Sequence, residues 1–224
     1  MKKLVFSAAL VLSLGLAACG EEKTAGESKE ETQTPASAET EKVQKEESKS
    51  DDNEVKEGPL TKAGQWTMDG EDKVTLVKIK EVNQTYKQGP INLTIESVKL
   101  LHHSNISNET KEYLKNVSGK DVTELNTIQL IYKMENTVDD NVMMSAIDTI
   151  TTDTKAQING YDSMSLNEDT GSYSGQVIVD GMAIFPYFNG SLEDINTVFI
   201  NTGMAFNSDS GTDLGDSQRI EIAF

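Results

Sequence analysis

The oxygen-bearing side chains of a loop near the C-terminus have a spacing that a hard cation could use. Asn207, Asp209 and Asp213 alternate with small residues, and calcium takes about six to eight oxygen ligands in proteins. The EF-hand pattern fails here, because its glycine position holds Thr212 and its final glutamate position holds Gln218. We therefore expect a flexible acidic turn, with a calcium site as the alternative.

Two other sets of side chains have metal-binding chemistry but unsuitable spacing. His102 and His103 are the only histidines, and because neighbours in a strand point to opposite faces, they should not converge on one metal. Thioethers suit Cu(I), but the methionines of the domain are scattered, which favours positions in the core. Six of them are Met134, Met143, Met144, Met164, Met182 and Met204.

Three aspartates, Asp148, Asp153 and Asp162, could supply the paired carboxylates of a hydrolase. No sequence feature brings two of them together. The nucleophile elbow, the zinc-protease helix and the phosphate-binding glycine loop are also absent from the sequence. The chain is therefore predicted not to be an enzyme and to carry no cofactor.

The densest group of aromatic residues is Phe185, Tyr187 and Phe188. If exposed, these side chains would form a docking surface for a protein partner, because aromatic residues concentrate interface energy. Aromatic residues at a strand end more often pack inward, and that is the favoured interpretation. The three residues remain the candidates for partner binding.

The first twenty residues have the pattern of an export signal. Lys2 and Lys3 precede an apolar run from Leu4 to Leu16, which is shorter than the ~20 residues of a membrane span. The following Leu-Ala-Ala-Cys-Gly resembles the lipobox of bacterial lipoproteins. The resemblance implies that Cys19 receives diacylglycerol and, after cleavage, becomes a lipid-bearing N-terminus. Cys19 is the only cysteine, so its modification leaves no disulfide or thiol chemistry in the protein.

Composition divides the chain into three parts. Residues 1–18 form the predicted signal peptide, residues 19–59 the lipidated cysteine and a charged linker, and residues 60–224 one folded domain. The linker is almost free of apolar residues, and such a segment should be disordered. The net charge of −17 disfavours nucleic acid and anionic polymers as partners.

The sequence of the domain predicts mostly strands and little helix. Several stretches are rich in β-branched residues and are bounded by Gly, Asn or Asp, which is typical of strands. They span residues 74–79, 91–98, 127–134, 142–150, 155–158, 176–185, 197–202 and 219–224. Residues 107–117 alone predict a helix, capped by Ser107 or Asn108, with Tyr113, Leu114 and Val117 as its apolar side. The expected fold is all-β, an antiparallel β-sandwich with a short inserted helix, and a barrel is the alternative.

The strand pattern resembles the immunoglobulin-like domain of many Gram-positive surface lipoproteins, a domain of unknown function related to telomeric-repeat-binding-factor-like sandwiches. The matching segments are Ile91–Leu101, Leu125–Val142, Ile147–Thr154 and Gly175–Tyr187. The resemblance implies an immunoglobulin-like sandwich outside the cytoplasm and brings no catalytic residues. The sequence departs from the pattern near residues 104–120 and in the loop 207–216.

These features together predict a lipoprotein on the extracytoplasmic face of the cell membrane. Its expected role is non-catalytic binding of a protein partner at the cell surface. Capture of a solute or of Ca²⁺ is the alternative, and an envelope hydrolase is the least favoured interpretation.

Overall fold

The computed structural model describes residues 52–164 and 169–224, which belong to one compact unit beginning at Ser50. The predicted signal peptide, Cys19 and most of the predicted linker lie outside the described residues. Across the two described ranges, no helix is both long and apolar enough to cross a bilayer.

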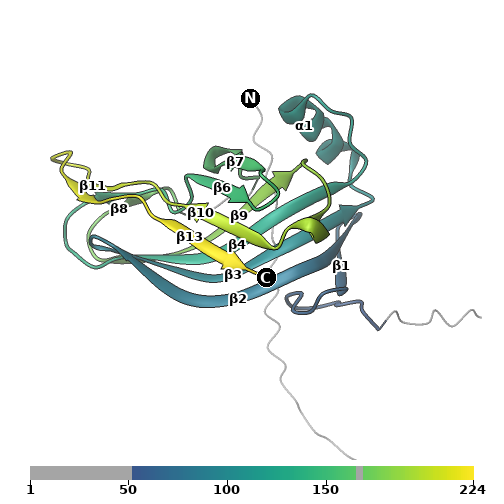
Figure 1. Ribbon diagram of the computed structural model, residues 1–224, viewed down its shortest axis with the longest axis horizontal. Coiled ribbons are helices and arrows are strands. Elements are labelled where there is room, and N and C mark those ends of the chain that lie inside the picture. The colour runs from purple at the N-terminus through teal and green to yellow at the C-terminus, as the bar shows by residue number, and fades with distance from the viewer. Residues whose placement is uncertain (1–51, 165–168) are drawn as a thin grey trace, which may run out of the picture. The chain divides into compact units, whose positions relative to one another are not determined.

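Five antiparallel strands form the largest sheet, in the order β1-β2-β3-β4-β9 (Figure 1). They span Trp66–Asp69 (β1), Asp72–Gln88 (β2), Ile91–Ser104 (β3), Leu125–Asn136 (β4) and Val177–Tyr187 (β9). Along β4, Leu130, Tyr132 and Met134 are buried while the residues between them stay partly exposed. One face of this sheet therefore belongs to the core.

Two smaller antiparallel sheets complete the core. The first has the order β13-β10-β6-β7 and the second β12-β11-β5-β8. Their strands span Arg219–Ala223 (β13), Thr197–Asn201 (β10), Thr149–Thr152 (β6), Gln157–Asn159 (β7), Asp213–Gly215 (β12), Ala205–Asn207 (β11), Val142–Met143 (β5) and Ser172–Tyr173 (β8). One hydrophobic cluster joins Leu130 of the large sheet to Ile150 and Val142 of the smaller ones. The predicted all-β antiparallel sandwich is confirmed.

The predicted strand 142–150 is wrong, because this stretch contains β5 and β6, which belong to different sheets. Between them Ala146 and Ile147 are buried while the chain crosses from one sheet to the other. A buried crossover is as apolar as a strand, which explains the error. The first predicted strand is also too short, since β2 continues to Gln88 through two irregularities in its pairing with β3.

The inserted helix α1 spans Asn108–Ser118 and lies between β3 and β4, as predicted. Ser107 caps it, accepting a hydrogen bond from the Thr110 amide at 3.1 Å. Gly119 ends it in the left-handed conformation. Of the predicted apolar side, Leu114 alone is buried. Two short 3₁₀ helices follow later in the chain, η1 (Gly160–Asp162) and η2 (Leu192–Asp194).

The folded unit begins several residues before the predicted boundary at residue 60. The Val55 amide donates to the Trp66 carbonyl at 2.8 Å, and the Trp66 amide donates to the Asn53 carbonyl at 3.0 Å. Leu60 is 6% exposed and packs in a small second cluster with Leu76 of β2. The segment from residue 53 onward therefore belongs to the domain, although its charged composition is that of a linker.

Candidate functional site

Exposed apolar side chains gather in one region of the described surface. Eight large apolar residues are exposed, and five of them line two hollows. The five are Tyr113, Val117, Met143, Tyr161 and Met204. Tyr161 is 95% exposed and lines both hollows, which are therefore adjacent. Single exposed apolar residues are ordinary, but a group around concave surfaces points to binding.

The smaller hollow, called here the aromatic pocket, has a volume of about 350 Å³. Its rings come from three parts of the fold: Tyr113 of α1, Tyr161 of η1, and Tyr187 and Phe188 at the end of β9. Polar side chains complete its wall, and these are Ser118, Lys120, Gln157, Asp162 and Asn189. The pocket thus combines ring faces with donors and acceptors of hydrogen bonds.

Local packing explains why two of these rings are exposed. α1 buries Leu114 alone, against Ile106 and Leu125. Tyr113 therefore stays 39% exposed at the pocket. Tyr161 follows Gly160, whose amide donates to the Asp148 carbonyl at 2.7 Å. A side chain at residue 160 would overlap a backbone carbonyl, so the glycine allows η1 to pack closely while Tyr161 points outward.

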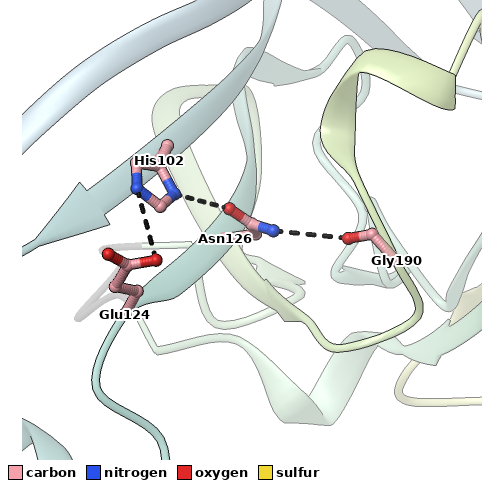
Figure 2. A network of polar contacts seen from close by, with 4 residues as sticks. All are labelled: His102, Glu124, Asn126 and Gly190. Atoms are coloured by element: carbon pink, nitrogen blue, oxygen red, sulfur yellow. Dashed lines mark hydrogen bonds and ion pairs between the residues drawn. The ribbon is translucent and has the colours of Figure 1, made fainter.

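A polar network fixes the loop that carries Phe188 and Asn189 (Figure 2). Asn126 donates from Nδ2 to the Gly190 carbonyl at 3.4 Å, and its Oδ1 lies 2.9 Å from Nδ1 of His102. Because Oδ1 accepts, His102 Nδ1 carries the hydrogen. The other ring nitrogen, Nε2, lies 3.9 Å from a carboxylate oxygen of Glu124. The chain from β3 through β4 thus holds this loop in place.

Two further contacts hold the same loop from inside the pocket. The Tyr187 hydroxyl donates to the Asn189 carbonyl at 3.2 Å. Lys120 Nζ lies 5.7 Å from the centre of the Phe188 ring, within the range of a cation–π contact. The aromatic pocket is therefore largely formed before any ligand arrives.

The larger hollow, called here the methionine pocket, has a volume of about 810 Å³. Met143 of β5 lies opposite Phe206 of β11 in their strand pairing, and both side chains line the pocket together with Met204 and Tyr161. Met143 is 39% exposed and Met204 is 45% exposed. The expectation that these methionines fill the core is therefore wrong for both, and also for the exposed Met182.

A partly buried carboxylate braces one wall of the methionine pocket. Asp169 accepts hydrogen bonds from the Tyr132 hydroxyl at 3.0 Å, the Tyr173 hydroxyl at 2.6 Å and the Gly171 amide at 2.9 Å. Burial, and then the neighbouring carboxylate, raises the pKa of Tyr173 far above its usual value. Tyr173 therefore stays a neutral donor. These contacts join β4 to the segment before β8 and make the wall rigid.

Two of the three aromatic candidates pack inward, which confirms the favoured interpretation of their clustering for both. Phe185 is 0% exposed and Tyr187 is 2% exposed, so they do not form the exposed docking surface that their clustering suggested. Both belong to the core because β9 turns these side chains inward, although each still lines the floor of a pocket. Phe188 is half-buried at the wall of the aromatic pocket.

The metal-ligand candidates near the C-terminus lie in the hairpin of β11 and β12. Asn207 Oδ1 accepts from the backbone amides of Asp209 and Ser210 at 3.0 and 2.9 Å, and Asp213 is exposed on β12. Asn207 thus closes a turn with the oxygen that a cation would need. Among the residues with assigned positions, no three His, Cys, Asp or Glu side chains are placed to hold a metal ion.

The remaining sequence candidates do not form a common site. His102 and His103 bond to different partners, Asn126 and Thr127, in agreement with the expected opposite faces. Asp153 accepts from the Asn196 amide, and Asp148 accepts from the Thr149 hydroxyl. Asp162 alone of the three aspartates lines a pocket, the aromatic one.

Tyr113 and Tyr161 are the pocket residues that sequence reasoning missed. Tyr113 belongs to the predicted apolar side of the helix, where burial is the natural expectation. Tyr161 stands between Gly160 and Asp162, and an aromatic residue in a turn of glycine and acid was a signal of exposure.

Comparison with known proteins identifies similar chains but no family, because no family model matches the sequence. A stretch of 98 residues is 33% identical to the uncharacterized protein YdhF of Bacillus subtilis strain 168. That match covers 42% of this chain and 42% of YdhF, so it spans less than half of that relative. The crystal structure of a functionally unknown protein from Listeria monocytogenes EGD-e superposes with a TM-score of 0.48 at 14% identity, covering 67% of this chain and 86% of that chain.

Proposed function

We propose that this chain is a lipoprotein of the extracytoplasmic face of the cell membrane that binds a protein partner without catalysis. The observation that carries the proposal is the methionine pocket, where Met143, Met204 and Tyr161 are exposed around a rigid hollow. Methionine side chains adapt to the shape of a partner, and methionine and aromatic residues are enriched in protein interfaces.

The geometry of the pocket supports a protein partner over a catalytic role. Asp169 is its carboxylate, and that group already accepts three hydrogen bonds from the protein. It is therefore engaged in bracing the wall rather than in activating a water. Exposed thioethers and rings offer area for an apolar side chain of a partner, which is where interface energy concentrates.

Photo-crosslinking in living cells tests the partner. We would replace Met204 by p-benzoylphenylalanine and, as a matched control, replace Ile178, which is 60% exposed and lies outside both pockets. We expect one reproducible protein adduct from position 204, none from 178, and loss of the adduct when Met143→Lys places a charge in the pocket. Equal adducts from both positions, or none from position 204, would contradict the proposal.

Membrane attachment is tested separately through Cys19. Cells grown with labelled palmitate should incorporate the label into the wild-type chain and not into Cys19→Ser. Mass spectrometry of the N-terminal peptide should find diacylglycerol on residue 19. An unmodified cysteine, or label that persists in the serine variant, would exclude the proposed anchor while leaving the partner proposal to its own test.

A further inference from the structure

We propose that the aromatic pocket is a binding site for a neutral saccharide. Sugars present apolar C–H faces edged by hydroxyl groups, so a site for them needs ring faces and side chains that both donate and accept hydrogen bonds. Tyr113 and Tyr161 supply exposed rings, and Gln157 and Asn189 supply amides with both functions. This site differs from the methionine pocket in every lining residue except Tyr161.

The polar side chains of the pocket are available to a ligand. Gln157, Asp162 and Asn189 are exposed, and their side chains make no hydrogen bond to any residue with an assigned position. In the hairpin of β11 and β12, by contrast, the side-chain oxygen of Asn207 accepts hydrogen bonds from two backbone amides. The aromatic pocket therefore keeps unused acceptors and donors beside its rings.

Charge and polarity argue against other ligand classes. Lys120 is the one cation in the lining, and Asp162 stands in the same lining as an anion. A phosphate or an acidic polymer would therefore gain little electrostatic binding energy, especially from a chain of net charge −17. A purely apolar ligand would cover Gln157 and Asn189 without giving them partners, which is costly. A neutral ligand with several hydroxyl groups carries no unfavourable charge and can form hydrogen bonds with both amides.

Size and rigidity fit the same ligand. Small-molecule sites have volumes of roughly 300–1,000 Å³, and the aromatic pocket, at about 350 Å³, suits a mono- or disaccharide unit of a longer chain. Its Phe188 wall is fixed through Asn126 and Tyr187, so binding requires little ordering of the protein. One side remains open at Tyr161, where a longer oligosaccharide could continue.

Isothermal titration calorimetry with the full chain tests the proposal. The probes are the β-1,4-linked tetramers of N-acetylglucosamine and of glucose, an α-1,4-linked glucose tetramer, and a proline-rich peptide as the probe of a different class. We expect saturable binding of at least one saccharide below about 1 mM, the lower limit of useful affinity. Failure of every saccharide to bind with a dissociation constant below about 1 mM, or binding of the peptide alone, would overturn the proposal.

Variants then locate the site. Tyr161→Ala and Tyr113→Ala should each weaken saccharide binding about tenfold, and Tyr161→Phe, which keeps the ring, should weaken it less than about threefold. Ile178→Ala and Met204→Ala should change nothing, because neither residue lines the aromatic pocket. Binding that survives both tyrosine-to-alanine changes would overturn the assignment. Since Met204 belongs to the other pocket, failure here is distinguishable from failure of the partner proposal.

Discussion

The two segments that depart from the lipoprotein resemblance lie at opposite ends of β4, and they use their polar residues in different ways. α1 precedes β4, whereas the hairpin of β11 and β12 pairs with β5, which follows β4 (Figure 1). The hairpin bonds its polar side chains to its own turn. The α1 end leaves rings and amides exposed around a pocket. The acidic loop therefore closes its own turn, whereas the inserted helix contributes exposed side chains to the wall of the aromatic pocket.

The largest effect should come from crowding the hairpin end. Gly89 has φ +56°, and a Cβ there would overlap the backbone carbonyl of Leu214 in β12. We expect Gly89→Ala to lower the free energy of unfolding by roughly 3–4 kcal/mol. Gly211→Ala is the control, because Gly211 has φ +70° but nothing within 4 Å of a Cβ, and it should cost only about 1–2 kcal/mol. Urea unfolding followed by the fluorescence of Trp66 measures both, and equal losses would refute the role of close packing.

At the α1 end, acid should weaken the fold through His103. Burial, and then the neighbouring His102, lowers the pKa of His103 from 6.5 to about 4. Between pH 6.5 and pH 4 the unfolded chain therefore binds more protons than the folded chain. The stability that is present above pH 6.5 falls as the pH approaches 4. We expect a loss of about 2 kcal/mol, allowing for partial exposure of the ring.

His103→Gln removes the titrating group and places an amide near Thr127. In the wild type, His103 Nε2 lies 3.0 Å from the Thr127 hydroxyl oxygen. Between pH 6.5 and pH 4 the free energy of unfolding of the wild type should fall by about 2 kcal/mol more than that of the variant, as unfolding curves at several pH values will measure. An identical pH dependence in the variant would mean that other groups cause the acid loss.

A smaller effect should follow from opening the hairpin turn. Asn207→Ala removes the oxygen that accepts from two backbone amides, and we expect a loss of about 1 kcal/mol. Asp213→Ala, at an exposed position of the same hairpin, should change stability by less than about 0.5 kcal/mol. The melting temperature should be the same in calcium and in chelator. A rise with calcium that depends on Asn207 would instead favour the cation alternative.

The smallest effect on stability should come from the rings of the α1 end. Tyr161 is 95% exposed and Tyr113 is 39% exposed, so replacing either by alanine should shift the free energy of unfolding by less than about 0.5 kcal/mol. Thermal unfolding by circular dichroism measures this directly. A large loss in either variant would show that these rings stabilise the fold, and the contrast between the two ends would disappear.

Most of the large sheet was predictable because its strands carry the signal of one buried face. Residues 91–98 alternate apolar and polar side chains, and the strand they predict forms the first part of β3. The strands β5 and β8 have two residues each, which is too few for any periodic pattern. The break between β5 and β6 was equally invisible, since burial in a crossover and burial in a strand select the same residues.

The site was less predictable than the fold, because pockets form between segments that are distant in the chain. Tyr113, Tyr161 and Phe188 meet only through the packing of α1, η1 and the end of β9. The aromatic neighbours of Phe188 mark it as a candidate in the sequence, but its exposure depends on which way the strand turns its side chains. Phe185 and Tyr187 point inward for that reason, and no composition rule separates them from Phe188.

The segment around Asn53 holds the contacts that would first take up tension from the N-terminal side of the domain. Its Glu54 forms a parallel bridge with Trp66, and two backbone hydrogen bonds join the segment to β1. Leu60, held against Leu76, lies next along the chain. Tension from residues N-terminal to Asn53 would therefore load these two hydrogen bonds and the packing of Leu60 before it reached the sheets that carry the pockets.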